Sequence, residues 1–186
     1  NYVSTFTLRD GTVRSGNEGQ TYLLTVDNGS KLIFESGTYY GGITRTNGTI
    51  DIREGCTFDA DIRAFLTGGL TQNTAGTVVN PANAVVMIET ADGIDYYYTL
   101  QEALAAATDG DTVRLLSDVE PDEMLSIGQA VTLDLNGHTI DSKYNGAYAI
   151  NIESNGVKIT DSTVSGSRAD GQAGGTIIAS TLALRI

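Results

Sequence analysis

The sequence predicts an all-β protein in which short strands stack as the rungs of a coil, a β-solenoid. The 186 residues include 22 Gly but only 2 Pro, and the turn-forming residues Asn, Asp, Ser and Thr are abundant, which indicates many tight turns. A short segment of alternating apolar and polar residues, closed by a residue pair ending in Gly, recurs about every 20 residues. Repeats of this kind are typical of a coil whose rungs bury their inner faces against one another.

The repeated segment is illustrated by Ile50-Asp51-Ile52, which is followed by the turn pair Glu54-Gly55. Its alternation is typical of a strand with one buried face. Asn-Gly pairs between such strands also predict antiparallel hairpins, so a β-sandwich is the alternative fold. The regular recurrence, with apolar residues in equivalent places, favours the solenoid. The copies cover residues 6–13, 24–34, 32–39, 50–58, 131–137 and 150–160.

Two short helices are predicted to interrupt the strands. Residues 61–68 predict one helix, with Asp61 as its N-cap and an apolar face behind it. Residues 99–108 predict the other, in which Thr99 at the N-cap and Glu102 three residues later form a capping box ahead of an apolar stripe. All remaining structure is expected to be strands and turns.

The charge of the chain excludes two classes of partner. Eleven Lys and Arg residues stand against 23 Asp and Glu, which gives a net charge of −12. Such a surface repels nucleic acid and anionic lipid, because binding to phosphates needs clustered basic residues. No apolar run approaches the length of about 18 residues that membrane insertion requires. We therefore expect no nucleic-acid partner and no membrane insertion.

Three segments resemble the start of a right-handed parallel β-helix. They are Tyr98–Ala107, Asp109–Val113 and the run Leu133-Asp134-Leu135-Asn136-Gly137-His138-Thr139-Ile140. Together they are similar to the pectate-lyase-like modules of large secreted bacterial surface proteins. The resemblance implies that the helix at 99–108 caps the open end of the coil, that the third segment is an early rung, and that the protein is extracellular, at a bacterial cell surface.

The resemblance also divides the chain into two domains. Residues 50–66 are similar to the last rung and terminal helical turn of a preceding module of the same kind. We therefore expect residues 1–83 to form β-solenoid rungs with a terminal helical turn. Residues 84–186 are expected to form the helix-capped start of a second β-helix module.

Enzymes of this fold family use clustered carboxylates, so the acids on the predicted rungs are the candidate catalytic residues. Asp134, Asp141 and Asp161 are the three acids whose convergence would form such a cluster. Asp134 alternates with Leu133 and Leu135 and is expected to face outward. Solvated carboxylates, or turn carboxylates that bind their own backbone, account for all three equally well. The sequence leaves enzymatic activity undecided and leans against it.

The remaining reactive side chains predict no metal site and no cofactor. His138 is the single histidine, and neither a His-x-x-x-His nor a Cys-x-x-Cys spacing occurs. We interpret His138 as a structural turn residue. Cys56 takes the place of a Thr in the earlier copies of the repeat, which indicates a half-buried rung position.

Adjacent tyrosines are candidate glycan contacts. Tyr39 and Tyr40 form one run, and Tyr96 and Tyr97 belong to another. Neighbours in a strand alternate faces, so one Tyr of each run should point outward, where its ring can stack on a sugar. The alternative is that these rings seal the junction between the two domains.

The last residues predict a site of self-association. Residues 176–186 read as one alternating strand with Ile178, Leu182, Leu184 and Ile186 available to one face and no cap after it. An uncapped strand recruits another strand, and contact of one end of the molecule with the other would build a fibre. The alternative is that further rungs normally continue the coil.

These observations favour a non-catalytic, extracellular structural or adhesive solenoid module of a bacterial surface protein. End-to-end association into fibres is a further expectation. The alternative is a carbohydrate-active enzyme, of the polysaccharide lyase or glycoside hydrolase type, or a module that binds cell-surface or host glycans. Convergence of the three aspartates in one groove would favour the enzyme.

Overall fold

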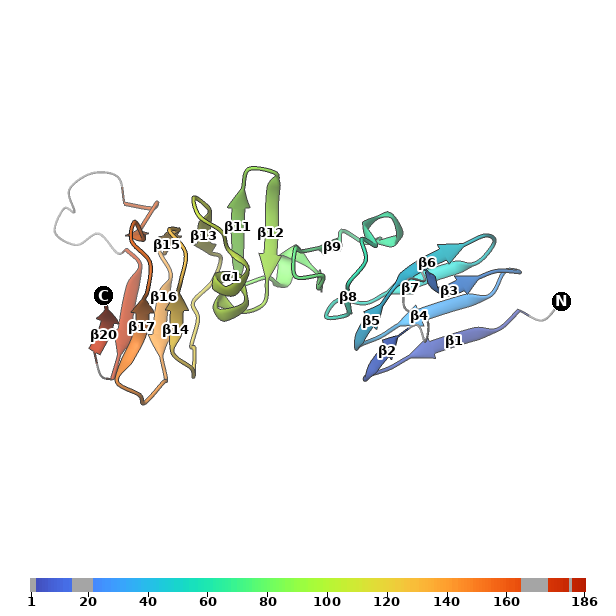
Figure 1. Cartoon of the computed structure of the whole chain (residues 1–186), viewed down its shortest axis with the longest axis horizontal. Coiled ribbons are helices and arrows are strands. Elements are labelled where there is room, and N and C mark those ends of the chain that lie inside the picture. Colours follow the sequence, from blue (N-terminus) through green and yellow to red (C-terminus); the bar gives the residue numbers. More distant parts are fainter. Residues whose placement is uncertain (1–2, 15–21, 165–173, 181) are drawn as a thin grey trace. The chain divides into compact units, whose positions relative to one another are not determined.

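The computed structural model describes residues 3–14, 22–164, 174–180 and 182–186. The protein is mostly β, with many small parallel sheets that follow one another along the chain as in a β-helix (Figure 1). The fold class expected from the sequence is therefore confirmed. Contacts divide the chain into two compact units, Asn1–Ala82 and Asn83–Ile186, and a 3-10 turn, η2 (Pro81–Asn83), spans their border. No helix in the described residues is long and apolar enough to cross a membrane.

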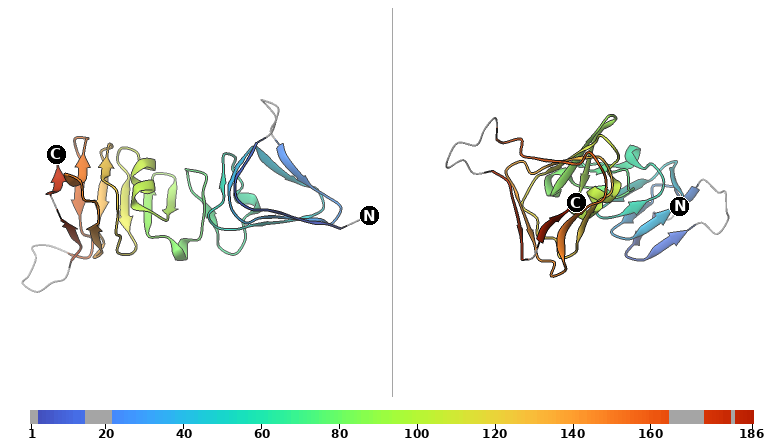
Figure 2. Two further views of the ribbon diagram at one scale, coloured as in Figure 1. Left: turned by 90° about the horizontal axis from the view of Figure 1, so that it is seen from below. Right: turned by 60° about the vertical axis from the view of Figure 1, so that its left-hand side comes forward.

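The first unit is a three-sided coil made of parallel strands. One side is the sheet β1–β4–β7, the second is β2–β5–β8, and the third is the pair β3–β6. Each rung visits the sides in the same order, so β1, β2 and β3 form the first rung (Figure 2, left). The strands are β1 (Thr5–Leu8), β2 (Thr12–Arg14), β3 (Tyr22–Val26), β4 (Lys31–Phe34), β5 (Thr38–Tyr40), β6 (Gly42–Arg45), β7 (Thr49–Ile52) and β8 (Thr57–Phe58).

Stacked apolar residues fill this coil. Leu32 on β4 lies in register with Ile50 on β7, and both are buried. Phe34, Tyr39 and Phe58 form an aromatic cluster whose ring centroids are 4.7–5.1 Å apart. Because the repeat places apolar residues at the same position of each rung, the parallel register brings them into contact.

The last rung of the first unit is covered by an irregular segment. Its short strands, β9 (Thr71–Gln72) and β10 (Val78–Val79), pair antiparallel. Residues 76–78 also bond to β8, with the Val78 N–H donating to the Cys56 carbonyl oxygen at 2.8 Å. The buried Gln72 amide accepts from the Ile62 N–H at 2.9 Å and donates to the carbonyl oxygens of Phe58, Ala60 and Gly76. These bonds satisfy backbone groups that the end of a coil leaves exposed.

The helix predicted at residues 61–68 is wrong in extent. The structure has only one 3-10 turn there, η1 (Arg63–Phe65), with Ile62 at its N-cap position and no side-chain cap. Asp61 instead forms an ion pair with Arg63, whose guanidinium and backbone N–H both donate to its carboxylate. Ile62 is buried and packs in the core, so tertiary packing overrides the helical pattern of this segment.

The second unit is also a three-sided coil, and an antiparallel hairpin pairs with its first rung. The hairpin β11 (Val86–Thr90) and β12 (Gly93–Tyr97) pairs with β13 (Thr112–Leu115), and the same sheet then continues in parallel through β15 (Thr132–Asp134) and β18 (Lys158–Thr160). The other two sides are the sheets β14–β17–β20 and β16–β19. Their strands are β14 (Leu125–Ile127), β16 (Thr139–Ser142), β17 (Tyr148–Ile152), β19 (Thr176–Ala179) and β20 (Leu182–Arg185).

The helix predicted at residues 99–108 is confirmed as α1 (Leu100–Ala106). Thr99 is its N-cap, and the Glu102 N–H donates to the Thr99 hydroxyl at 3.1 Å. Leu100, Ala103 and Leu104 are buried in the core of the second unit. The helix lies against β14, the hairpin and β13, which are the cover and first rung of this coil. A helical end cap is therefore present (Figure 1).

The expectation of one continuous strand over residues 176–186 is wrong. The chain forms two strands in different sheets, with β19 pairing with β16 and β20 pairing with β17. A coil turns a corner between neighbouring sides, and this corner falls at Ser180; Thr181 lies outside the described residues. Ile178 and Leu184 therefore belong to different sides of the coil.

Candidate functional site

The carboxylate of Asp134 lies at the centre of a polar network on the second coil. Its Oδ2 atom accepts from Arg114 Nε at 2.8 Å, and its Oδ1 atom accepts from the backbone N–H groups of Ser162 at 2.8 Å and Asn136 at 3.0 Å. Only 2% of Asp134 is exposed. Asp134 is therefore not a solvated carboxylate, because neighbouring rungs cover both of its oxygens; the bond from the Asn136 N–H fits the alternative of a turn carboxylate that binds its own backbone.

Arg114 connects this carboxylate to the covering hairpin. Arg114 Nη1 lies 2.6 Å from Glu89 Oε1 on β11, so the guanidinium bridges acids on the strands at either side of β13. Burial alone would raise the pKa of Asp134, but the Arg114 hydrogen bond and the two N–H donors outweigh it and hold this pKa below its usual value. The same bond to Asp134 raises the pKa of Arg114. Asp134 is therefore ionised near neutral pH, and both of its oxygens accept hydrogen bonds.

Asp161 binds the corner between β15 and β16. Its Oδ1 atom accepts from the Gly137 N–H at 3.0 Å and from the Thr163 hydroxyl at 2.6 Å, while its Oδ2 atom accepts from the Gly175 N–H. The Thr163 hydroxyl and these N–H donors lower the pKa of Asp161 to about 2. The carboxylate thereby joins the turn after β18 to the corner before β16 and to the start of β19.

Asp141 is the third candidate acid and has a different environment. It lies on β16, a different side of the coil from Asp134, and its Oδ2 atom accepts from Lys143 Nζ at 2.6 Å. Thus Asp134 and Asp161 both bind the Asn136-Gly137 corner, whereas Asp141 pairs with a surface lysine. Each of the three is bound to structural partners. Among the described residues, no group of three His, Cys, Asp or Glu side chains is placed to hold a metal ion.

Two of the four candidate glycan tyrosines are buried. Tyr39 has no exposed surface and Tyr97 has 1%, so neither presents its ring to a sugar. Burial raises the pKa of Tyr39 to about 12, and its hydroxyl donates to the Ser36 carbonyl oxygen. Tyr40 is half-buried, with the Arg14 guanidinium 4.3 Å from its ring centroid, and Tyr96 is also half-buried. Tyr40 and Tyr96 therefore stay as the accessible candidates.

His138 and Cys56 occupy structural positions. His138 Nδ1 lies 3.4 Å from Asp118 Oδ1, which also accepts from the Thr139 N–H at 2.8 Å. Cys56 is completely buried, and this burial raises the pKa of its thiol to about 11. The expectation of a half-buried Cys56 is therefore wrong, because residues 76–78 cover its rung.

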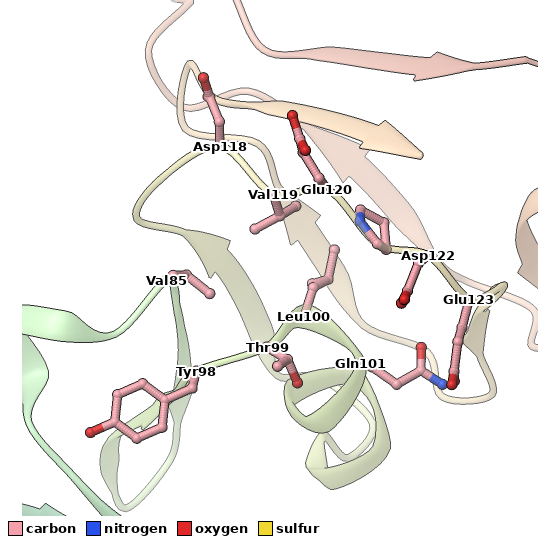
Figure 3. Close-up of a pocket in the computed structure, with 11 residues that line it drawn as sticks. Val85, Tyr98, Thr99, Leu100, Gln101, Asp118, Val119, Glu120, Asp122 and Glu123 are labelled. Atoms are coloured by element: carbon pink, nitrogen blue, oxygen red, sulfur yellow. The ribbon is translucent and has the colours of Figure 1, made fainter. Parts of the chain in front are cut away.

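A cavity of about 470 Å³ adjoins α1, and sequence reasoning missed it. It lies between Tyr98–Gln101 and the acidic segment Asp118–Glu123 (Figure 3). Val85, Leu100 and Val119 give it an apolar part, and Asp122 and Glu123 point towards the start of the helix. The four acids between Asp118 and Glu123 are visible in the sequence. The cavity beside them is not, because it depends on how the helix packs.

The predicted self-association residues lie at the last rung of the second coil and are exposed. The exposed fractions are 48% for Ile178, 63% for Leu182, 40% for Leu184 and 97% for Ile186. At the first rung of the other coil, Phe6 on β1 is 59% exposed. Large apolar side chains are thus accessible on the first rung of the first unit and on the last rung of the second.

Comparison of the chain with protein-family models, curated proteins and solved structures gives no significant match.

Proposed function

We propose that the chain is a non-catalytic structural module, a pair of short β-solenoids of the kind that builds extracellular surface proteins of bacteria. The main support for this proposal is that the carboxylates of Asp134 and Asp161 are hydrogen-bonded within the coil. Both oxygens of Asp134 accept from neighbouring rungs. Asp161 accepts from the Gly137 N–H of the preceding rung and from the Gly175 N–H of its own rung, so both carboxylates hold the coil together. A general acid or base needs a carboxyl group that can exchange a proton with substrate near neutral pH.

The location at a cell surface is part of the same proposal. It is supported by the resemblance of residues 98–140 to pectate-lyase-like modules, by the parallel sheets, and by a helix at the start of the second coil. A structural module needs a scaffold that repeats and a surface that stays soluble. Stacked rungs supply the first property and the net charge of −12 supplies the second.

The competing function is carbohydrate chemistry, and one experiment separates the two. The purified chain is incubated with acidic and neutral polysaccharides, and reducing ends and unsaturated products are measured. We expect no turnover, while Asp134→Asn and Asp161→Asn both lower the melting temperature. Turnover that Asp134→Asn abolishes while the protein stays folded would overturn the proposal.

Glycan binding without turnover is tested separately on the accessible tyrosines. Binding to an array of bacterial and host glycans, lost in Tyr40→Ala or Tyr96→Ala and kept in Tyr144→Ala, would establish an adhesive module. Tyr144 lies two residues after β16 and is also half-buried, so it is the matched control. Unchanged binding in the first two variants would exclude these rings as contacts.

A further inference from the structure

The first rung of the first unit and the last rung of the second unit have the same construction, with three strands each. Within the described residues, β1, β2 and β3 pair on one side only, with β4, β5 and β6. In the second unit, β18, β19 and β20 pair on one side only, with β15, β16 and β17. We call these the first-rung edge and the last-rung edge. Each offers a row of N–H and C=O groups to a further strand.

The opposite face of each coil differs, because one of its strands has an antiparallel partner. Residues 76–78 pair with β8 in the first unit, and the hairpin strand β11 pairs with β13 in the second. Both partners run antiparallel to the strand they meet, which ends the parallel stacking. In the described chain β8 and β13 therefore have a strand partner on each side, whereas β7 and β14, at the same faces, lie against η1 and α1.

Both edges also carry apolar residues in core register. Phe6 on the first-rung edge lies opposite Leu32, and Leu184 on the last-rung edge lies opposite Ile150, which is completely buried. Ile159 and Ile177 likewise lie opposite the buried Leu133 and Ile140. These side chains line up with the core, yet Phe6 and Leu184 are accessible because nothing described stacks on them.

We propose that the last-rung edge of one copy of this chain stacks on the first-rung edge of a second copy, so that three parallel ladders continue across the interface. This inference rests on the proposed structural function and names its partner. Each edge has three strands in the same chain order around the coil, so β18 meets β1, β19 meets β2 and β20 meets β3 with all strands parallel. The contact buries Phe6, Ile159, Ile177 and Leu184.

The charges at the interface are compatible with this pairing. β1 and β19 carry no charged residue, so Lys158 on β18 and Arg14 on β2 each meet an uncharged strand. Arg185 at the end of β20 meets the end of β3. The residue after β3 is Asp27, whose charge is opposite to that of Arg185. The two edges are different surfaces, and a contact between different surfaces repeats without closing unless a rotation intervenes. The product is a filament that grows with concentration.

Sedimentation velocity over a wide concentration range, with negative-stain microscopy, tests the proposal. We expect the average mass to rise with concentration and filaments to form. Phe6→Asp and Leu184→Asp each block one edge and should each give a monomer. Ile94→Asp is the matched control, because Ile94 is 49% exposed on β12 and belongs to neither edge. This control variant should still form filaments.

Mixing the two blocked variants gives the sharpest result. Phe6→Asp keeps its last-rung edge and Leu184→Asp keeps its first-rung edge, so an equimolar mixture should form a 1:1 dimer that does not grow. A folded wild-type monomer at all concentrations, or a closed dimer of a single blocked variant, overturns the stacking and leaves the structural function intact. Polysaccharide turnover by the monomer would instead overturn the proposed function.

Discussion

Arg114 and Asp134 lie side by side on the parallel strands β13 and β15, with Arg114 Nε 2.8 Å from Asp134 Oδ2. The side chain of Asp134 is 3% exposed, and that of Arg114 is 27% exposed. An ion pair in this position matters because removing one partner leaves the other charge buried.

Arg114→Ala should therefore destabilise the second unit, by about 3 kcal/mol. Equilibrium urea unfolding followed by circular dichroism measures this change. Arg9→Ala is the matched control, because Arg9 pairs with Glu35 at the surface and surface pairs contribute little. Equal midpoints for Arg114→Ala and the wild type would show that the network does not support the fold.

The ionisation of Asp134 predicts an acid-sensitive contribution to stability. Its pKa is lower in the folded chain than in the unfolded chain, where an Asp titrates near pH 3.9. The stabilisation is fully present above that value and is lost as the pH falls through the folded pKa. Asp161, with a folded pKa of about 2, contributes with the same sign between about pH 4 and pH 2.

Urea midpoints of the wild type and Asp134→Asn at pH 6 and pH 3 isolate this contribution. We expect the wild type to be the more stable at pH 6 and the difference to shrink at pH 3. Comparing the two proteins at each pH removes the effect of the other carboxylates, whose mutual repulsion also falls in acid. A difference that stays constant with pH would contradict the assignment.

The helical cap gives a prediction about packing. Leu104 on α1 is 5% exposed, so Leu104→Asp places an unpaired charge in the core of the second unit. The expected loss is about 3 kcal/mol or more, because burying a charge without a partner is costly. Ala105→Asp on the exposed face of the same helix is the control. An unchanged melting temperature in Leu104→Asp would mean that α1 does not cap the coil.

The Gln72 amide gives a parallel prediction for the first unit. Gln72→Leu removes the acceptor for the Ile62 N–H and the donor to three carbonyl oxygens, and each buried group left unsatisfied costs about 1–3 kcal/mol. Limited proteolysis should cut near residues 60–75 sooner than in the wild type. Gln101→Leu, an exposed change on α1, should leave the cleavage rate unchanged.

Local signals explain the parts of the fold that the sequence predicted. The capping box of Thr99 and Glu102 acts within one helical turn, and it forms as expected. Asn136 and Gly137 both adopt positive φ, 47° and 79°, and turn the chain between β15 and β16. A single corner of this kind also fits a hairpin, but corners that recur along the chain indicate a coil.

Long-range contacts explain the sequence-based predictions that were wrong. Asp134 alternates with leucines as an exposed residue would, but Arg114 and Ser162, from the rungs before and after, enclose it. Residues 61–68 have a helical pattern, yet Ile62 is fastened in the core by Gln72. The corner at Ser180 has neither Gly nor Pro, so nothing in the local sequence separates β19 from β20.

The distance along the chain between paired strands sets an order of assembly. Thr49 pairs with Lys31, so the second and third rungs of the first unit close a short loop, whereas Thr176 pairs with Thr139 and closes a much longer one. Closing a longer loop costs more chain entropy and slows the pairing. Amide hydrogens of β4 and β7 should thus gain protection early in refolding. Those of β19 should gain it last, and they should exchange first from the folded protein.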